Sequence, residues 1–316
     1  IPVYAQSGKA GLSTWEFCNW TKDALDKSKV RGFAEPLPSA IREQYDLVSR
    51  DNAYSSIHNP KNLGEMLTAR KRLVFDELLR IQLLLLARKR QLELATQGIS
   101  HDFSGDLVNK LIESLPFEPT NAQSKAIAEI FQDLRASCPM HRLLQGDVGS
   151  GKTLVAIAAL LSVVEAGKQG SIMAPTEVLA EQHFVSAKEL LGSFILMDST
   201  NLLGKRKLNI SLLTSQTSEK DAKEIRAKLR RGEIDIIVGT HSLIQESVEF
   251  ADIGLAVVDE QHRFGVDQRA ALRNKGNSAA IPDLLVMTAT PIPRTAAMTV
   301  YGDLDVSILN ELPEGR

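Results

Sequence analysis

Cysteine is scarce in this sequence, and its scarcity argues against two kinds of stabilising site. The 316 residues include two cysteines, Cys18 and Cys138, which do not stand in the Cys-x-x-Cys spacing of zinc sites and redox motifs. A disulfide framework and a structural zinc site are therefore not expected. Both thiols are predicted to be buried apolar side chains of a protein from a reducing compartment.

Long apolar runs and an excess of one charge are also absent. Stretches such as residues 154–161 are far shorter than the roughly 18 apolar residues of a membrane-spanning helix, so no contact with a membrane is expected. The formal net charge is −2, whereas nucleic-acid-binding proteins usually carry a basic excess. A basic surface must therefore be local or lie outside this chain. The opening IPVYAQSGKAG lacks an initiator Met and a signal core, so we expect a fragment.

Three regions differ in their sequence pattern. Residues 1–30 combine a short extended piece with a turn and a helical pattern. Residues 31–112 open with the Pro-rich EPLPSAIRE and continue with a long helical pattern, in which Leu73, Leu78 and Ile81 recur at helical spacing. This second region is predicted to be a helical linker. Its basic clusters could touch nucleic acid, although such clusters are more often a solvated helix face.

From residue 113 to residue 316, short aliphatic runs alternate with helical segments. This alternation of strands and helices predicts an α/β fold with a parallel sheet covered by helices on both faces. Ligands of such sheets bind at the carboxyl ends of the strands, where the motifs described below fall. The predicted strands are residues 142–145, 171–175, 209–214, 234–240, 255–260 and 284–290.

A phosphate-binding loop is predicted between the first of these strands and the helix after it. The segment matches G-x-x-x-x-G-K-[ST], and about 1% of chains this long would match by chance, so the flanking strand and helix are the confirming context. Its glycines let backbone N–H groups surround phosphate oxygens. Lys152 is expected to contact the β- and γ-phosphates of ATP, and the Thr153 hydroxyl to bind Mg²⁺. The nucleotide-binding residues are Gly146, Asp147, Val148, Gly149, Ser150, Gly151, Lys152 and Thr153.

An acidic box, Asp259-Glu260-Gln261-His262, ends the strand LAVV. Carboxylates at the end of an apolar strand are costly unless something uses their charge. Asp259 is predicted to hold Mg²⁺, and Glu260 to orient or deprotonate the attacking water. Gln261 and His262 are assigned to the same catalytic group, with Lys152. The alternative is an ordinary helix N-cap with an acidic first turn.

Three further strand ends carry threonine. Such ends offer hydroxyl and backbone N–H groups, which bind sugar-phosphate without reading base sequence. The last of them could also report the nucleotide state to the acidic box. Plain caps and turns are the alternative at each place. The residues predicted for DNA contact or coupling are Pro175, Thr176, Gly239, Thr240, Thr288, Ala289 and Thr290.

Two other segments complete the predictions from the residues. The Gln123 side chain can both donate and accept, which suits an adenine edge, and Phe117 just before it is assigned to the same nucleotide site. Residues 218–233 are predicted to form an exposed helix with i,i+4 ion pairs such as Glu224–Lys228.

These motifs, in this order, resemble those of superfamily 2 helicases. Gln123 lies in what resembles the Q motif, GDVGSGKT resembles motif I, APTEVLAEQH motif Ia, VGTH motif Ib, DEQH motif II and TATPIPRT motif III. The stretches GDVGSGKT, IDIIVGTHSLIQ, DEQHRFGVDQR and MTATPIPRT, with the closing ELPEGR, are similar to the RecG family in particular. The resemblance covers residues 113–316 strongly and the helices around ARKRLVFDELL moderately. The opening IPVYAQSGKAGLS is weakly similar to the exit of an OB-fold wedge domain.

The resemblance implies an ATP-dependent DNA helicase that remodels stalled forks and Holliday junctions in repair and recombination. It implies ATP and Mg²⁺ as cofactors, branched DNA as partner and a monomeric state. It also implies three parts: the end of a wedge domain (1–30), a helical linker (31–112) and the first RecA-like motor domain (113–316). The expected compartment is the bacterial cytoplasm (nucleoid), or a plastid or mitochondrion of bacterial ancestry.

Two departures limit what the fragment is expected to do alone. The chain ends at Arg316, before the second motor lobe and its arginine finger, which in other phosphate-loop enzymes raises the rate roughly 10³–10⁵-fold. The wedge that splits strands is also almost entirely missing. We therefore expect weak ATP binding and very slow hydrolysis. Separately, the segment LLTS (212–215) stands where the family usually has Thr-Gly, which leaves that DNA contact open.

Three alternatives remain. The motor of a transcription-repair coupling factor shares TATPIPRT, but it tends to have a DEEH box and a Tyr in the phosphate loop; binding of RNA polymerase would identify it. A phosphate-loop phosphotransferase would need an acceptor pocket and a lid, and a nucleotide-binding module would lack turnover. The motor interpretation requires Lys152 and Asp259 to come from neighbouring strand ends and to meet around one triphosphate and its magnesium.

Overall fold

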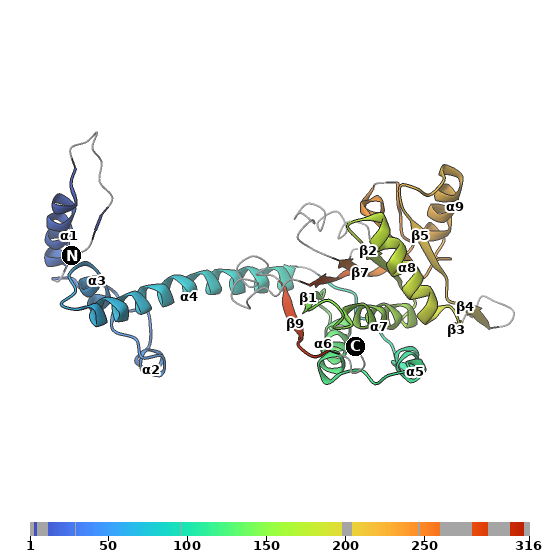
Figure 1. Ribbon diagram of the computed structural model, residues 1–316, viewed down its shortest axis with the longest axis horizontal. Coiled ribbons are helices and arrows are strands. Elements are labelled where there is room, and N and C mark those ends of the chain that lie inside the picture. The colour runs from blue at the N-terminus through green and yellow to red at the C-terminus, as the bar shows by residue number, and fades with distance from the viewer. Residues whose placement is uncertain are drawn as a thin grey trace. The chain divides into compact units, whose positions relative to one another are not determined.

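The computed structural model describes residues 3–4, 12–28, 30–95, 97–197, 204–245, 247–259, 280–289 and 304–312. The chain forms two compact units, Ile1–Leu85 and Leu86–Arg316, each described here by itself (Figure 1). The predicted division into wedge, linker and motor domain remains a prediction. Within the second unit, residues 97–112 contribute Phe103, Leu107 and Leu111 to the core.

The first unit is helical, with a small apolar core. Its helices are α1 (Thr14–Ser28), α2 (Ser39–Gln44), α3 (Arg50–His58) and the first part of α4 (Leu63–Ala95). The long helix predicted in this region is confirmed by α4. Helix α1 buries none of its residues. Among the described residues of this unit, the buried apolar side chains are Leu37, Leu47, Ala53 and Ala69.

A buried arginine adds a network of ion pairs and hydrogen bonds to this small apolar core. The fully buried Arg72 pairs with Glu35 at 2.6 Å and Asp76 at 3.0 Å, and donates to the Val48 carbonyl. Burial alone would raise the pKa of Glu35. The hydrogen bonds from Arg72 and from the backbone of Arg50 and Leu37 outweigh it and lower that pKa to about 2. Breaking such a buried network is costly because it leaves an unpaired charge.

The second unit is built on a parallel sheet, as predicted, but the sheet has seven strands rather than the six predicted. The strand order is β5-β6-β2-β7-β8-β1-β9, and every adjacent pair is parallel. Six strands match predicted runs, whereas β9 was not predicted. The strands are β1 (His141–Gly146), β2 (Gln169–Met173), β5 (Ile210–Leu213), β6 (Ile236–Gly239), β7 (Ile253–Asp259), β8 (Asp283–Thr288) and β9 (Asp305–Leu309). A separate hairpin pairs β3 (Ile195–Met197) with β4 (Lys205–Lys207).

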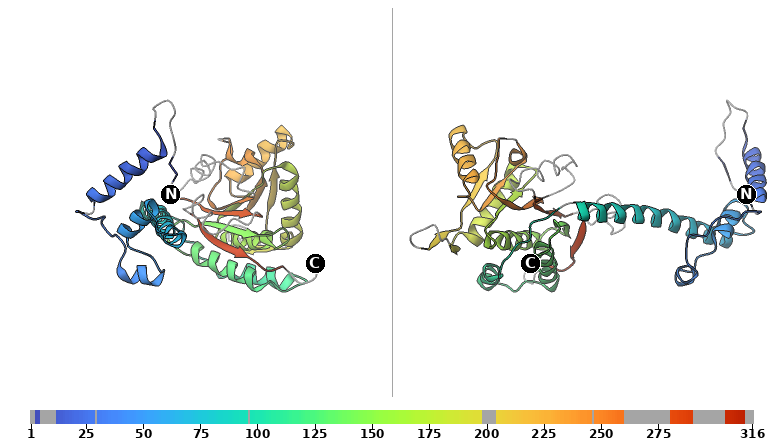
Figure 2. Two further views of the ribbon diagram at one scale, coloured as in Figure 1. Left: turned by 60° about the vertical axis from the view of Figure 1, so that its left-hand side comes forward. Right: turned by 180° about the vertical axis from the view of Figure 1, so that it is seen from behind.

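Helices cover both faces of this sheet, which Figure 2 shows from two further sides. They are α5 (Asp106–Ser114), α6 (Asn121–Leu134), α7 (Lys152–Glu165), α8 (Glu177–Leu191) and α9 (Glu219–Arg230), with a short 3-10 helix η2 (His241–Ile244). Successive strand residues point to opposite faces. Leu144 and Val257 therefore join the core under α5 to α8, while Leu143 and Val258 join the core on the α9 side.

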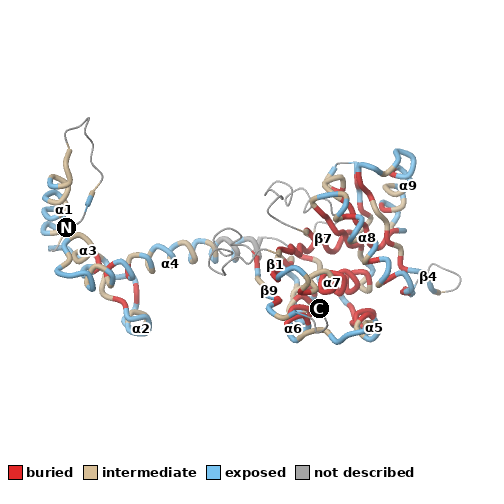
Figure 3. The backbone as a smooth tube through the Cα atoms, in the orientation of Figure 1, coloured by how far each residue is buried: buried red, intermediate tan, exposed pale blue. Residues whose placement is uncertain are grey.

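Helix α7 lies at the centre of this unit. Every residue from Leu154 to Val164 is buried, and α7 packs against α5, α6 and the sheet (Figure 3). This position explains why the longest apolar run of the sequence is a helix without a polar face. By contrast, α9 is amphipathic, and its predicted Glu224–Lys228 pair is confirmed at 2.7 Å.

The amino ends of β1 and β8 hold a buried polar cluster. Asp283 accepts hydrogen bonds from the Met140 backbone N–H at 2.6 Å and pairs with His101 Nε2 at 2.8 Å. Burial raises the pKa of Asp283 to about 6, against the opposing hydrogen bond from His101. Nearby, Arg142 binds Asp133 and Glu129 of α6 and Ser307 of β9. The first strand is thus tied to its neighbours where the strands begin.

The prediction for the cysteines was wrong. Cys18 is half-buried and Cys138 is exposed. Cys18 lies on α1, which buries nothing, and Cys138 lies in the short connection between α6 and β1. A small thiol can occupy either place because it needs neither a partner nor full burial.

Candidate functional site

The predicted nucleotide residues lie at the carboxyl edge of the sheet, on three consecutive strands. Gln145 of β1 pairs with Thr288 of β8, and Met287 of β8 pairs with Asp259 of β7. The expectation that Lys152 and Asp259 come from neighbouring strands was wrong, because β8 separates β1 from β7. With about 4.8 Å between adjacent strands, the two strand ends are about 10 Å apart. Thr288 therefore ends the strand that separates them.

The phosphate loop begins where β1 ends and delivers the chain into α7. Gly149 (φ 86°) and Gly151 (φ 82°) have left-handed backbones, which other residues adopt only with strain. Gly151 is the N-cap of α7 and gives it no side-chain cap, whereas Thr120, Thr176 and Ser218 cap α6, α8 and α9. The helix dipole at this N-terminus favours an anion.

The loop is packed so closely that larger residues would not fit. A Cβ atom on Gly151 would overlap Nε2 of Gln123, and one on Gly146 would overlap Oγ of Ser150 and Leu309. Ser150 is buried, and within the described residues its hydroxyl has no hydrogen-bond partner. Val148, at the tip, is 85% exposed. A rigid loop with an unused hydroxyl and an exposed tip fits a phosphate-bearing ligand.

Lys152 contacts the loop's own backbone. Its Nζ donates to the carbonyl of Gly146 at 2.6 Å and to that of Asp147 at 2.9 Å. An ammonium group held by two carbonyl oxygens is already positioned beside the loop.

Gln123 braces the phosphate loop from the start of α6. Its Oε1 accepts from the Thr120 N–H at 2.9 Å, and its Nε2 donates to the Ser150 carbonyl at 2.8 Å. The side chain is 1% exposed. Both polar atoms of its amide are therefore bonded within the protein, and an adenine contact would need this buried side chain to move. Phe117 is 43% exposed, and its contact with nucleotide remains a prediction.

Asp259 has a partner that the sequence did not reveal. Oδ2 of Asp259 lies 2.7 Å from Nε2 of His183, on α8, and both side chains are largely buried. His183 is the last residue of APTEVLAEQH, the segment that resembles motif Ia, but local spacing gives no sign of its contact with Asp259. Its position became informative when the sheet order placed β2, the strand before α8, beside β7.

The threonine-bearing strand ends of β2 and β6 lie side by side. Met173 pairs with Gly239, so Pro175 and Thr176 follow one strand and Thr240 the next. Thr176 is exposed and its Oγ1 accepts from the Leu179 N–H as the cap of α8. A Cβ atom on Gly239 would overlap the Leu213 carbonyl, which explains the glycine.

The N-terminus of α8 is tied to the end of β5 by Glu177. Its carboxylate accepts from the Ser215 N–H at 3.1 Å, from the Ser215 hydroxyl and from Gln216 Nε2 at 2.7 Å. The hydrogen bond from the Ser215 hydroxyl lowers the pKa of Glu177. This contact, which sequence reasoning missed, joins the segment LLTS to motif-like residues of α8.

Several predicted residues cannot be placed. Glu260, Gln261, His262 and Thr290 lie outside the described residues. Of their neighbours, Thr288 is buried and Ala289 is half-buried. The roles predicted for these residues remain predictions.

The side chains present suit magnesium better than a transition metal. In the described ranges, no group of three or more His, Cys, Asp or Glu residues could hold a metal ion. Mg²⁺ needs no such group, since it is usually bound by one or two protein oxygens together with phosphates and water. Thr153 at the start of α7 and Asp259 could supply those oxygens.

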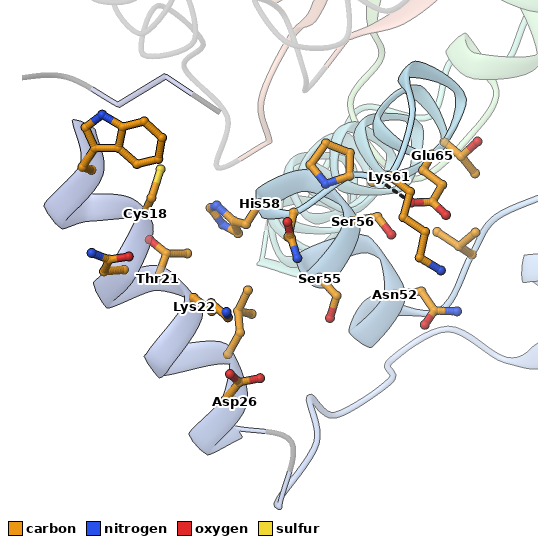
Figure 4. A pocket seen from close by; sticks show the side chains of 18 residues that line it. Cys18, Thr21, Lys22, Asp26, Asn52, Ser55, Ser56, His58, Lys61 and Glu65 are labelled. Carbon is orange, nitrogen blue, oxygen red and sulfur yellow. Dashed lines mark hydrogen bonds between the residues drawn. The ribbon is translucent and has the colours of Figure 1, made fainter. Parts of the chain in front are cut away.

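Other parts of the described chain offer less to a ligand of this kind. A cavity of about 900 Å³ in the first unit lies between α1, α3 and the start of α4, and Cys18, Lys22, Asn52 and His58 line it (Figure 4). None of its lining residues belongs to the predicted site.

No helix among the described residues is both long and apolar enough to cross a membrane.

Comparison with known proteins identifies close relatives. The DEAD/DEAH box helicase family matches residues 120–299. The chain is 47% identical to the ATP-dependent DNA helicase RecG of Synechocystis over 92% of this chain and 33% of that protein. It is 46% identical to the RecG of Bacillus subtilis over 89% of this chain and 39% of that protein. The chain thus spans well under half of these relatives.

A solved structure agrees over the whole chain. The structure of RecG bound to a three-way DNA junction matches with a TM-score of 0.73 and 39% identity, covering 100% of this chain and 40% of that protein. The predicted RecA-like architecture and the predicted similarity to RecG are confirmed by these matches.

Proposed function

This chain belongs to the DEAD/DEAH box helicase family, and we propose that it is the ATP-binding motor lobe, with the helices before it, of a RecG-type DNA helicase. The observation that carries the proposal is the carboxyl edge of the sheet. There the glycine-rich loop and the uncapped α7 follow β1, and the Asp259 carboxylate ends β7, with β8 between these two strands. Such an edge provides donors for phosphates on one side and a metal ligand on the other.

The residues divide the work by their chemistry. The glycine-rich loop and the N-terminus of α7 bind phosphate oxygens, and Lys152 moves from the Gly146 and Asp147 carbonyls to the β- and γ-phosphates. Thr153 and Asp259 hold Mg²⁺, which when bound neutralises charge on the phosphates. Glu260 orients the attacking water, with Gln261 and His262 beside it. Gln123 keeps the loop in shape through Ser150.

DNA is the proposed macromolecular partner. Pro175, Thr176, Gly239 and Thr240 end adjacent strands, and Thr176 is exposed, which supports contact with sugar-phosphate there. Thr288 and Thr290 then connect this edge to hydrolysis. The RecG structure that matches this chain is bound to a three-way DNA junction. We therefore propose branched DNA, including stalled forks and Holliday junctions, as the substrate of the whole protein.

The state and location of the protein follow the same proposal. The whole protein acts as a monomer on DNA in the bacterial cytoplasm, or in an organelle of bacterial ancestry. The chain described here holds one motor lobe.

ATPase activity of the full-length protein tests the proposal. Rates are measured without DNA and with fork, linear and single-stranded DNA, for the wild type and Lys152→Ala. We expect DNA to stimulate the wild type, and Lys152→Ala to lower the rate about 10²–10³-fold, the usual loss when one electrostatic donor to a transition state is removed. Lys220→Ala, on the exposed face of α9, is the matched control and should keep the wild-type rate. Equal rates for the wild type and Lys152→Ala would refute the proposal.

A further inference from the structure

His183 links a predicted DNA-contacting helix to the predicted metal ligand. Its Nε2 lies 2.7 Å from Oδ2 of Asp259, and the side chains are 12% and 15% exposed. No other side chain in the described part of the chain hydrogen-bonds to Asp259. The contact joins residues that are 76 positions apart in the chain.

The chemistry of the pair fixes which atom donates. A carboxylate that holds Mg²⁺ accepts hydrogen bonds, so in the proposed arrangement Nε2 of His183 donates to Oδ2 of Asp259. One carboxylate oxygen is therefore turned toward α8, and the other is left for a metal ion or its water. Metal-binding carboxylates commonly have such a hydrogen-bonded partner, which sets their orientation.

The same helix carries the contacts that face the predicted DNA site. Thr176 caps α8, and Glu177 in its first turn binds Ser215 and Gln216 at the end of β5. His183 lies two turns further along this helix. The backbone hydrogen bonds of an α-helix hold successive turns together, so a displacement of the first turn of α8 is transmitted to His183.

We propose that His183 is a positioning residue that orients Asp259 for Mg²⁺ and, through α8, couples DNA contact at Thr176 to the metal site. The proposal rests on the proposed function, since it needs a nucleotide and magnesium at the carboxyl edge. It assigns His183 no contact with nucleotide or with the reacting atoms. Substitution of His183 should therefore change the Mg²⁺ dependence of nucleotide binding more than the nucleotide affinity in the absence of metal.

The test uses the full-length protein with His183→Ala, His183→Gln and the control Glu189→Gln, an exposed change on the same helix. A slowly hydrolysed fluorescent ATP analogue is bound at increasing Mg²⁺, and its affinity is also measured in EDTA. The melting temperature reports folding. The ratio of DNA-stimulated to unstimulated ATPase rates reports coupling.

His183→Ala should raise the Mg²⁺ concentration for half-maximal binding about tenfold, the usual loss on removing a partner of a metal ligand. Its affinity in EDTA should match the wild type, and its DNA stimulation should fall. His183→Gln keeps an N–H donor, so it should recover part of both losses. Glu189→Gln should change neither.

Three outcomes would count against the proposal. Unchanged Mg²⁺ dependence in His183→Ala would overturn the positioning role. An equal loss of affinity with Mg²⁺ and in EDTA, with a lower melting temperature, would show a merely structural role. A shift in Mg²⁺ dependence with unchanged DNA stimulation would overturn the coupling. If Lys152→Ala instead keeps full ATPase activity, the proposed function itself fails.

Discussion

Polar groups at the two ends of strands β1 and β8 differ in whether they have hydrogen-bond partners within the protein. At the amino ends, both oxygens of Asp283 are bonded within the protein, and Arg142 pairs with two carboxylates and a hydroxyl. At the carboxyl ends, α7 starts without a side-chain cap and the buried Ser150 hydroxyl has no partner among the described residues. The same strands thus have hydrogen-bonded polar groups at their amino ends and, at their carboxyl ends, a buried polar group without a partner among the described residues.

This difference separates stability from function. Buried polar groups that find partners within the chain hold the fold together, and those that do not are costly unless a ligand uses them. The amino end has one exception, Nδ1 of His101, which has no partner in the described structure. Changes at the amino ends should therefore alter unfolding more than nucleotide binding, and changes at the carboxyl ends should alter nucleotide binding.

The largest expected effect is that of Gly151→Ala. The new Cβ would sit at a left-handed φ of 82° and overlap the Gln123 amide. Strain and overpacking together should lower the free energy of unfolding by about 2–4 kcal/mol, and the displaced loop should bind nucleotide at least about tenfold more weakly. Chemical denaturation and titration with a fluorescent nucleotide measure the two effects.

Gly167→Ala is the matched control for this change. Gly167 has φ 77° and follows the other end of α7, where a Cβ would meet nothing within 4 Å. It should cost about 1–2 kcal/mol of unfolding free energy and leave nucleotide affinity unchanged. Equal nucleotide affinities for the two variants would contradict the special role of the loop.

Arg142→Met is expected to have the next largest effect. It would leave Asp133 and Glu129 without their cation, and these carboxylates are 24% and 34% exposed. Partial access to water reduces the penalty of a broken buried pair, so we expect a loss of about 2–3 kcal/mol in the free energy of unfolding. Nucleotide affinity, measured in the same way, should stay within error. A variant that folds normally but binds nucleotide poorly would contradict the separation of the two ends.

The pH dependence of unfolding sharpens the comparison at Asp283. Burial raises the pKa of Asp283 from 3.8 to about 6, so the folded state favours the protonated carboxyl. Its contribution is fully present below about pH 3.8 and is lost as pH rises through about 6. At one pKa unit per 1.36 kcal/mol, the contribution amounts to about 3 kcal/mol at most.

Asp283→Asn should remove this contribution from the pH profile. The neutral amide mimics the protonated carboxyl and can still accept from the Met140 N–H. The free energy of unfolding should therefore fall less between pH 4 and pH 7 in the variant than in the wild type, as followed by urea denaturation. A steeper fall in the variant would show that the ionised Asp283 stabilises the fold.

The smallest effect is expected on the solvent-exposed helix α9. Glu224→Gln breaks the pair with Lys228, whose side chain is 40% exposed. Exposed i,i+4 pairs contribute little to stability because water screens their charges, so the melting temperature should barely change. A loss as large as that of Arg142→Met would mean that burial does not govern the strength of these pairs.

Local patterns in the sequence predicted the central sheet and the phosphate loop. The buried strands read as aliphatic runs, and Gly146 to Thr153 follow one of them at a fixed spacing. The edge strand β9 was missed because it is only partly buried and offers a weaker apolar signal. Local spacing also could not show that β8 lies between β1 and β7, since strand order depends on packing across the whole sheet.

Side-chain partners were the least predictable part of the site. Gln123 looked suited to an adenine, yet its amide is used by Thr120 and Ser150. His183 ends the segment that resembles motif Ia, but its contact was not predicted because its partner, Asp259, is 76 residues away. Both contacts arise from tertiary packing, which brings the first turns of helices to the ends of strands that are distant in the chain.

The most direct test is a structure of this chain with a non-hydrolysable ATP analogue and Mg²⁺. The account predicts that Nζ of Lys152 leaves the Gly146 and Asp147 carbonyls for the β- and γ-phosphates, with Mg²⁺ between the Thr153 hydroxyl and Asp259. A nucleotide bound elsewhere, or Lys152 still on both carbonyls beside bound phosphates, would contradict it.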